Sequence, residues 1–382
     1  MLEIISHRNG EVLNHQHGQE TADCLVIRLE GIADPQSLVT VNGNPAERRD
    51  RLFSAFIRLT DKINRVTVAG HNKFGDFQQS ITLVWDKQSV KRYAARIDDN
   101  IFFLREIARD RPKSLFEHFY LKNLRRLHQD YGTKFILKCF YRDDHQGFEM
   151  KEVPDCYRGE FQEHSDWLKL SFHAYSEFPD RPYQHATAAR LAADFDLVKD
   201  EIIRFAGEES FIAPTNVHWA MLPPNLFSVL RERGSRVLTS GGFLSNRIIV
   251  EGEIVEVGAA TCDIGFFYEQ DVARHMQAKR CFYDPDHDLF LSRTFFCCNI
   301  DTPAEIEEKI RTEDACRDGT DMMEAVTHEQ YAFPDYAGFL ADYFQRLDAA
   351  CRTLTELDYQ PVFFSQGIFG NTAWEKQSSA AK

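Results

Sequence analysis

The chain lacks the features that mark several classes of protein. Its 382 residues carry 45 basic and 59 acidic side chains, a formal net charge of −14, so no basic surplus attracts nucleic acid or an anionic membrane. No run approaches the roughly 18 apolar residues that a membrane-spanning helix needs. The first residues, Met1–Arg8, have neither a long apolar core nor a small-residue cleavage site, which favours a cytoplasmic protein if the chain begins at its natural start. We expect no nucleic-acid or membrane partner, and the oligomeric state stays open.

Cysteine and glycine motifs are missing as well. The nine cysteines are odd in number, none makes C-x-x-C, and the adjacent Cys297 and Cys298 lack a second pair at zinc-ribbon spacing. We therefore expect buried free thiols in a reducing compartment. There is no phosphate-binding glycine loop and no dinucleotide fingerprint, and Gly241–Gly242 indicates only a turn.

Hydrophobic residues are plentiful, at 43% of the chain with 31 phenylalanines, which is enough for a large core and more than one domain. Residues 1–87 contain short runs that alternate apolar and polar side chains, separated by turn signals, and they predict a β-sandwich. The runs are Cys24–Leu29, Leu52–Leu59, Val66–Val68 and Ile81–Trp85. The string Val41–Gly43, then Phe53, then Asn64–Val68 resembles immunoglobulin-like modules appended to carbohydrate enzymes.

The pattern changes near Lys87, where strand-like and helix-like segments begin to alternate. This alternation predicts a parallel (β/α) barrel over residues 88–372. Residues from about 241 to 301 mostly keep a period of two and predict a β-rich insertion, and residues 373–382 predict a disordered tail. The predicted strands are 91–98, 134–141, 167–172, 211–214, 236–239, 322–327 and 361–364, and the predicted helices are 101–131 (broken at Pro112), 188–206, 226–233, 303–311 and 336–357.

Candidate chemical groups follow the ends of these strands. Asp98 and Asp99 end the first barrel strand, His173 and Thr215 follow two later ones, and His328 follows another. The carboxyl ends of parallel barrel strands meet on one rim, so we expect these groups to lie together. One carboxylate can hold a divalent metal while its neighbour takes a proton from water, which predicts metal-dependent hydrolysis. Taken singly, the aspartate pair would more simply cap a helix or a turn, and an isolated histidine would more simply be structural.

In this order the motifs resemble the polysaccharide deacetylase superfamily over residues 88–372. Arg96–Asp99 resembles its first motif, Phe172–Glu177 its second, and Val326–His328, before a long helix and a closing strand, its last. The resemblance implies a distorted (β/α) barrel and a metal-dependent hydrolase that removes an acyl group, N- or O-acetyl, from a carbohydrate. It implies Asp98 as general base, His328 as general acid, and Asp99 and His173 as metal ligands. The donor types suit Zn²⁺ first, with Co²⁺, Mn²⁺ or Ni²⁺ as alternatives.

Two motif positions depart from the family. Glu177 stands where a second histidine is expected, so the third ligand is either Glu177 or His185, which the sequence leaves open. Ile212 stands where an arginine would orient the base, so Asp98 needs another partner, Arg96 or His218. Expected substrate contacts are Thr215, His218, Trp219 and Tyr331, with a core position as the alternative for Trp219.

Two rival functions remain at this point. The barrel could be a metal-independent glycoside hydrolase that uses rim carboxylates such as Asp98, Glu177 and Glu329. Alternatively, the two replaced motif residues indicate a non-catalytic carbohydrate-binding protein on a degenerate barrel. Chelator treatment distinguishes the first rival from the metal-dependent reading.

Overall fold

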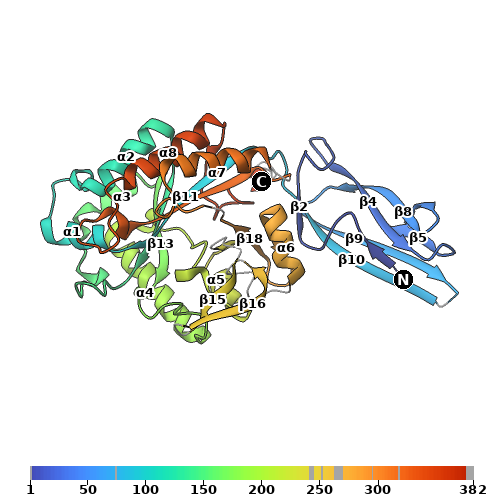
Figure 1. The fold of residues 1–382 in the computed structure, drawn as a ribbon, viewed down its shortest axis with the longest axis horizontal. Helices are drawn as coiled ribbons and strands as arrows, with labels where there is room; N and C mark the ends of the chain where they lie inside the picture. Colours follow the sequence, from blue (N-terminus) through green and yellow to red (C-terminus); the bar gives the residue numbers. More distant parts are fainter. Residues whose placement is uncertain are drawn as a thin grey trace. The chain divides into compact units, whose positions relative to one another are not determined.

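The computed structural model describes residues 2–73, 75–240, 245–250, 253–261, 270–294, 296–316 and 319–375. The chain divides into two compact units (Figure 1). Unit 1 comprises Met1–Ser89, Cys281–Asp288 and Asn371–Lys382, and unit 2 comprises Val90–Arg280 and Leu289–Gly370. The first boundary lies close to the predicted one at residue 87. The two later segments of unit 1 were predicted to belong to the insertion, the barrel and the tail, because sequence periodicity does not show which distant segments pack together.

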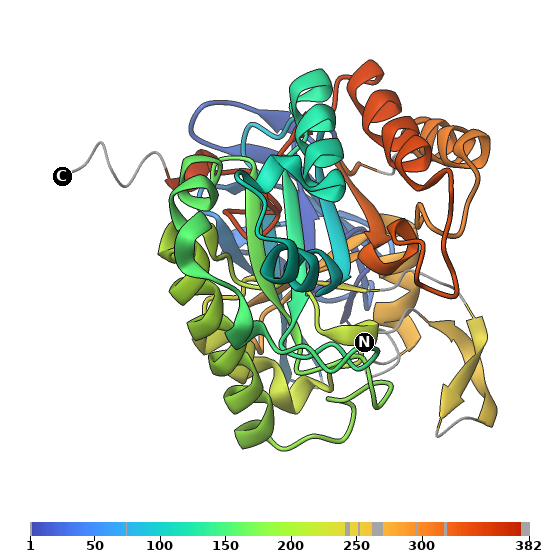
Figure 2. The ribbon, with the colours of Figure 1, turned by 90° about the vertical axis from the view of Figure 1, so that its left-hand side faces the viewer.

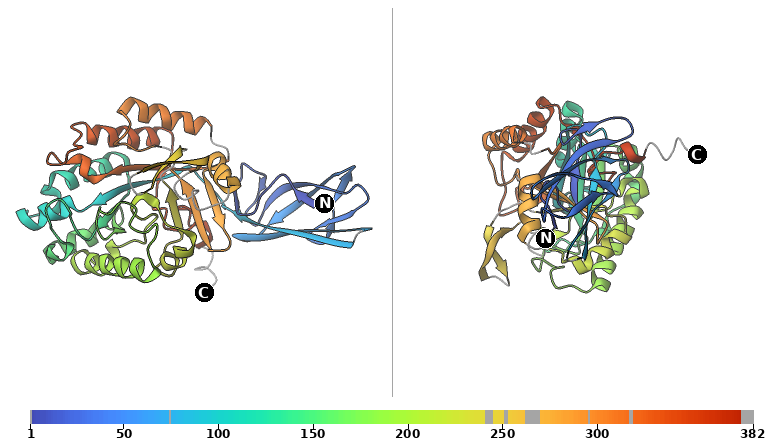
Figure 3. Two further views of the ribbon diagram at one scale, coloured as in Figure 1. Left: turned by 60° about the horizontal axis from the view of Figure 1, so that its bottom comes forward. Right: turned by 90° about the vertical axis from the view of Figure 1, so that its right-hand side faces the viewer.

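Unit 1 contains two five-stranded sheets with one shared core. Strands β4 and β8 alternate buried and more exposed residues, so that Leu25, Ile27 and Leu29 point inward together. The four predicted runs all form strands, whereas the immunoglobulin-like topology stays a prediction. The strands of the two sheets are β1 (Leu2–Ile4), β2 (Glu11–Leu13), β3 (Gln19–Glu20), β4 (Leu25–Ala33), β5 (Leu38–Val41), β6 (Asn44–Pro45), β7 (Glu47–Arg49), β8 (Leu52–Leu59), β9 (Ile63–Asn72) and β10 (Gly75–Trp85). A further strand of unit 1, β17 (Cys281–Asp284), belongs to neither of these sheets; Figure 3 shows the unit from two further directions.

Two late segments of the chain complete unit 1. The amide of Tyr283 in β17 donates to the carbonyl of Gly10 over 2.8 Å, and a Cβ on Gly10 would lie 2.1 Å from the carbonyl oxygen of Tyr283, so glycine is required there. The indole nitrogen of Trp374 donates to the carbonyl of Trp85 over 2.8 Å, and the two rings meet edge to face. The predicted disordered tail is therefore wrong for Ala373–Glu375, while residues 376–382 lie outside the described part of the chain.

Unit 2 is built on a parallel sheet in the order β13-β12-β11-β19, with β20 also pairing with β11. Its strands are β11 (Arg92–Asn100), β12 (Phe135–Phe140), β13 (Leu168–Ala174), β19 (Met322–His328) and β20 (Gln360–Pro361). Single parallel bridges at Phe211 and Cys297 extend the two edges, and β14 (Val237–Ser240) pairs separately with β18 (Leu289–Arg293). The predicted strand at 211–214 is thus reduced to one bridge. The described ladders do not form one continuous ring, so the closed barrel stays a prediction.

Helices surround these strands, with α4 on one side and α7 and α8 on the other (Figures 1 and 2). Local signals set several of their ends. Gly132 ends α2 in the left-handed region at φ 69°, Thr187 caps α4 by accepting from the amide of Arg190, and Thr302 and Glu305 form a capping box on α7. The helices are α1 (Phe102–Asp110), α2 (Phe119–Tyr131), α3 (Arg158–Glu163), α4 (Ala188–Ala206), α5 (Phe227–Glu232), α6 (Gln270–Lys279), α7 (Pro303–Ala315) and α8 (Tyr343–Glu356). None of the described helices has the length and apolar character that a membrane crossing requires.

The predicted β-rich insertion is only partly correct. It contains an antiparallel pair, β15 (Ser245–Val250) and β16 (Glu253–Thr261), but α6 follows where strand-like periodicity was predicted to continue. The predicted turn at Gly241–Gly242 and residues 262–269 of the predicted insertion lie outside the described residues.

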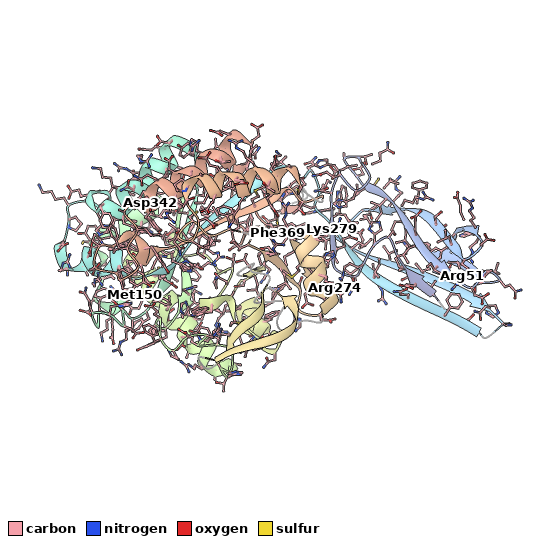
Figure 4. The ribbon with its side chains drawn as sticks, in the orientation of Figure 1. Arg51, Met150, Arg274, Lys279, Asp342 and Phe369 are labelled. Atoms are coloured by element: carbon pink, nitrogen blue, oxygen red, sulfur yellow. The ribbon has the colours of Figure 1, made fainter. Side chains whose placement is uncertain are left out.

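The C-terminal segment of unit 2 holds the start of β11. The guanidinium of Arg92, the first residue of β11, donates to the carbonyl of Phe369 over 2.7 Å and to the carbonyl of Ile368 over 3.1 Å; Phe369 is labelled in Figure 4. Arg92 is buried, so these bonds satisfy a charged group inside the unit. They fix the strand whose other end carries Asp98 and Asp99.

Candidate functional site

A pocket of about 360 Å³ lies where the strands of the parallel sheet end. Asp98 in β11 is the register partner of His328 in β19, so both side chains come from neighbouring strand ends. His173 comes from β13, and all three line the pocket together with Asp99 and His218. Of the strand-end groups that the sequence predicted to share a rim, the structure brings together Asp98, Asp99, His173 and His328 but not Thr215.

Asp99, His173 and His218 form a compact group of possible metal ligands. Asp99 Oδ1 lies 3.0 Å from His173 Nε2 and 3.1 Å from His218 Nδ1, and the two nitrogens are 3.2 Å apart. Although it is close to both nitrogens, Asp99 Oδ1 has no aligned hydrogen-bond donor within the described part of the chain. One carboxylate oxygen and two imidazole nitrogens are a donor set that a divalent cation fits.

The charge states of this group suit a cation. Burial lowers the pKa of His173, more than Asp98 and Asp99 raise it, so the imidazole is neutral and its lone pair is free to bind. Burial would raise the pKa of Asp99, but its interactions with His218 and His173 outweigh burial and hold the pKa well below its usual range. The carboxylate is therefore ionised at neutral pH.

A strained turn places His218 in this group. The two residues after it, Trp219 and Ala220, have φ values of 63° and 53°, a left-handed conformation that residues with side chains rarely adopt. The sequence predicted His218 as a substrate contact or as the partner of Asp98, and its place beside Asp99 was missed. The sequence did place His218 a few residues after the predicted strand at 211–214. In the structure Phe211 bridges to β13, the strand that carries His173.

The two candidates for the third ligand lie elsewhere, which corrects the prediction. Glu177 lines the pocket, but its Oε2 is bonded to His145 Nε2 at 2.7 Å and to Gln330 Nε2 at 2.9 Å. His185 is exposed, and it belongs neither to the pocket wall nor to the ligand group. Spacing within the motif favoured Glu177 as the third ligand, whereas the fold supplies His218, which lies 45 residues after His173 in the chain.

A buried arginine holds Asp98. Arg96, two residues earlier on β11, donates to Asp98 Oδ2 and also binds both carboxylate oxygens of Glu324 in β19. Burial would raise the pKa of Asp98, but the positive charge of Arg96 outweighs it and holds the pKa of this carboxyl well below its usual range. Ile212, where the family would carry an arginine, packs in a core cluster instead. Of the two partners that the sequence left open, the structure shows Arg96.

Lys138 is linked to the carboxylate of Asp98 through Asn216. It is fully buried in β12, and its ammonium donates to Thr215 Oγ1 at 2.6 Å and to Asn216 Oδ1. Asn216 Nδ2 in turn donates to Asp98 Oδ2 at 3.2 Å. Thr215 was predicted as a substrate contact, but it is buried, lies outside the pocket wall and is engaged by Lys138, which corrects that prediction.

His328 is held by a second polar group on the pocket wall. Its Nδ1 lies 2.8 Å from Asn299 Oδ1 and 3.8 Å from Cys297 Sγ. Burial lowers the pKa of His328, but the contact with Cys297 and the charges of Asp99 and Asp98 outweigh it and raise the pKa to about 9. The imidazole is therefore protonated at neutral pH and can donate a proton.

Glu329, which the metal-free rival reading needed as a rim carboxylate, is structural. Its two oxygens accept from the amides of Ile101, Phe102 and Phe103 at 2.6, 2.8 and 2.7 Å, which caps the first turn of α1. Burial raises its pKa to about 8 in spite of these bonds. No oxygen of Glu329 is left to face a substrate.

Aromatic side chains stand at the mouth of the pocket. Trp219 is 41% exposed, which answers the alternative of a core tryptophan, and Tyr331 and Tyr336 line the same pocket. The guanidinium of Arg181 lies 4.7 Å from the centre of the Trp219 ring. Exposed aromatic faces beside amide and carboxylate groups are typical of sites that bind polar rings.

No family model and no curated protein matches the chain. Three solved structures found to be similar are Bacteroides glycoside hydrolases. A Bacteroides ovatus GH5 xyloglucanase in complex with a XXXG heptasaccharide is 8% identical, with 93% of this chain and 100% of that chain covered and a TM-score of 0.25. A putative alpha-galactosidase from Bacteroides fragilis is 9% identical, with 97% and 79% covered and a TM-score of 0.26. A Bacteroides uniformis beta-glucuronidase is 12% identical, with 94% and 44% covered and a TM-score of 0.30.

These comparisons correct the predicted activity. The structures found are glycoside hydrolases, and no family model supports the resemblance to deacetylases, so removal of an acyl group is not retained as the function. Identities of 12% or less and TM-scores of 0.30 or less carry no argument for a particular enzyme. The function is therefore argued from the site itself.

Proposed function

We propose that the pocket hydrolyses glycosidic bonds, with Asp98 as the ionised carboxylate and His328 as the proton donor. The observation that carries this proposal is their pairing on adjacent strand ends of one pocket, an ionised acid beside a protonated base. Glycoside hydrolysis needs a carboxylate directed at the anomeric carbon and an acid at the leaving oxygen. The two groups meet those needs at neutral pH without a change of protonation on binding.

Each group has the surroundings that its role requires. Asp98 Oδ2 is held by Arg96 and Asn216, while Asp98 Oδ1 is buried without a hydrogen-bond partner among the described residues. A water beside that oxygen would give up a proton to it as the water attacks the sugar. Asn299 accepts from His328 Nδ1, which leaves the other ring nitrogen to donate toward the leaving oxygen.

The ligand group adds a place for a cation. Asp99, His173 and His218 would hold a divalent metal, Zn²⁺ first by donor type, and Co²⁺, Mn²⁺ or Ni²⁺ otherwise. When bound, it would supply positive charge to an oxygen of the substrate. The substrate we propose is a carbohydrate, whose ring would lie against Trp219 and Tyr331 at the mouth of the pocket.

Catalysis is favoured over binding alone because other residues of the chain supply the arginine and the histidine that two motif positions lack. Arg96 takes the place of the arginine missing at Ile212, and His218 takes the place of the histidine missing at Glu177. A protein that only bound sugar would have no need for a buried Arg96 paired with both Glu324 and Asp98, since buried charges cost free energy.

The test is a panel of aryl glycosides and neutral polysaccharides, with the appearance of reducing ends as the readout, before and after chelation and after addition of Zn²⁺. We expect activity that falls by about 100-fold or more in Asp98→Asn and His328→Gln. Asp180→Asn, at the edge of the same pocket, is the matched control and should keep activity within about threefold. Full activity in Asp98→Asn, or binding of glycans without any cleavage, would show that the proposal is wrong.

A further inference from the structure

Lys138 is a fully buried lysine that forms no ion pair with a carboxylate of the described residues. Its Nζ donates instead to two neutral oxygens, Thr215 Oγ1 at 2.6 Å and Asn216 Oδ1. Burial lowers the pKa of Lys138 well below its usual range, but either protonation state of the amine has enough N–H groups for both bonds. A buried amine costs free energy that an apolar side chain would not, so stability alone does not account for Lys138.

The contact with Lys138 fixes the orientation of the Asn216 side-chain amide. An asparagine amide carries an acceptor oxygen and a donor nitrogen, and a half-turn exchanges the two. Lys138 offers N–H donors on one side of Asn216, and the carboxylate of Asp98 offers only acceptors on the other. Because Oδ1 accepts from Lys138, Nδ2 faces Asp98 Oδ2 and donates to it over 3.2 Å. The reverse orientation would set donors against donors and oxygen against oxygen.

This orientation determines how Asp98 is held. Asp98 Oδ2 accepts from Arg96 and from Asn216, which leaves Asp98 Oδ1 without a hydrogen-bond partner in the part of the chain that the structure describes. A reversed amide would place Asn216 Oδ1 against Asp98 Oδ2, and the repulsion would push the carboxylate away from Asn216. Arg96 alone would then hold its direction.

We propose that Lys138 is a positioning residue for Asp98, acting through Asn216, whose amide it holds with the N–H toward the carboxylate. Asn216 lines the pocket, whereas Lys138 does not and so touches no substrate. The amide orientation depends on these contacts alone, while its effect on turnover rests on the proposed function. The rival is a purely structural role, in which Lys138 anchors the chain through Thr215.

The first arm of the test is NMR of the full chain with ¹⁵N-labelled asparagine, in which the side-chain NH₂ signal lost in Asn216→Leu belongs to Asn216. We expect this NH₂ group to be protected from exchange with water in the wild type, and to exchange roughly tenfold faster or more in Lys138→Met. Thr215→Val removes the other acceptor of Lys138 and should keep the protection. Lys169→Met, the same substitution on the neighbouring strand β13, is the matched control and should also keep it.

The second arm is a double-mutant cycle on glycoside cleavage. Lys138→Met should lower kcat by about 10-fold to 100-fold, because the carboxylate is less well placed, and should leave KM unchanged. In the Asn216→Leu background the same substitution should have no further effect on kcat, because the residue through which Lys138 acts is gone. A purely structural role would give additive losses.

The outcomes separate this proposal from the proposed function. An unprotected Asn216 NH₂ group in the wild type, unchanged exchange in Lys138→Met, or additive losses of kcat would overturn the positioning role. A wild type that cleaves no glycoside would overturn the proposed function instead, and exchange of the Asn216 amide would then decide the positioning role alone. If Lys138→Met fails to fold, Thr215→Val decides: retained protection supports the role through Asn216, and lost protection overturns it.

Discussion

Asp98 and Asp99 are adjacent in a strand, yet both reach the same pocket. Successive side chains of a regular strand point to opposite faces, so one of the two should point away. Asp99 instead has φ 63°, at a shift in the register of β11 against β12 between Ile97 and Asn100. This irregularity turns the second carboxylate toward His173 and His218, and it gives two neighbouring acids separate partners.

The ligand group leads to a first prediction at the residue scale. His218→Ala should weaken Zn²⁺ binding by about 100-fold or more, because one of three donor atoms is lost. His185→Ala removes an exposed histidine from the same unit and should bind Zn²⁺ like the wild type. Competition with a chromophoric chelator measures both affinities. Weaker binding in His185→Ala than in His218→Ala would contradict the assignment.

His328 gives a second prediction, on pH dependence. Its pKa is raised on folding from 6.5 to about 9, so its contribution to stability is complete below about pH 6.5 and is lost as the pH rises through about 9. The metal-free wild type should therefore lose more stability over this range than His328→Gln does. Thermal unfolding at several pH values measures the difference. Parallel curves for the two proteins would show that His328 is not held in its protonated form.

At the scale of single elements, the start of α1 depends on a residue far away in the chain. Three amides of its first turn donate to Glu329, which follows β19. By comparison, α7 is capped locally by Thr302 and Glu305 at an exposed end. The first arrangement ties a helix to the strand end that carries His328, while the second stabilises one helix alone.

Substitution of the two capping glutamates should separate these roles. Glu329→Gln replaces an accepting oxygen with a donor and leaves buried amides unsatisfied, so we expect a loss of roughly 1–3 kcal/mol and fast amide exchange at 101–103. Glu305→Gln keeps one acceptor at an exposed end and should cost about 0.5 kcal/mol. Hydrogen exchange measures the protection of the amides at 101–103, and denaturant unfolding measures the loss of stability in both variants. Unchanged exchange in Glu329→Gln would mean that Ile101–Phe103 have other acceptors.

The sequence predicted elements well where local signals are strong. The helix predicted over 188–206 has the same bounds as α4 in the structure, where Thr187 caps its start and Gly207 follows its end. Region 270–279 was misread because strand-like segments on both sides suggested a continued period of two, whereas the structure has α6 there. The last barrel strand, predicted over four residues, shortens to Gln360–Pro361.

The site was predictable to the extent that strand ends could be found. Asp98, Asp99, His173 and His328 all follow a strong strand pattern, so their meeting on one rim followed from the topology. His218 was misplaced because its backbone passes through two left-handed residues that no sequence pattern indicates. The contacts of Cys297 and Asn299 with His328 link residues about 30 positions apart, which spacing alone does not reveal.

At the scale of the whole molecule, unit 1 is assembled from three separated parts of the chain. Trp374 packs on Trp85 in the core of this unit, and Asn371 Nδ2 donates to Asp86 Oδ1 at 2.7 Å and to the carbonyl of Lys87 at 2.8 Å. These contacts come from the last described residues. The folding of the N-terminal sheets is therefore coupled to residues at the opposite end of the chain.

Truncation tests this coupling. A chain that ends after Gly370 should lose roughly 2–4 kcal/mol of unit 1 stability, because a partly buried tryptophan and its hydrogen bonds are removed. A chain that ends after Glu375 keeps Trp374 and should match the full chain. Denaturant unfolding followed by tryptophan fluorescence, with hydrogen exchange of β10 as a second readout, measures the difference. Equal stability of the two truncated chains would show that the Trp85–Trp374 contact contributes nothing.

The same arrangement imposes an order on folding during synthesis. The ribosome makes β1–β10 before Trp374, which lies 289 residues after Trp85 and is added on the order of tens of seconds later at typical elongation rates. Throughout that interval the indole of Trp85 has no tryptophan to cover it. Unit 1 is thus completed only after the strands and helices of unit 2 have been translated, and a nascent chain stalled before Trp374 would present this uncovered apolar surface to chaperones.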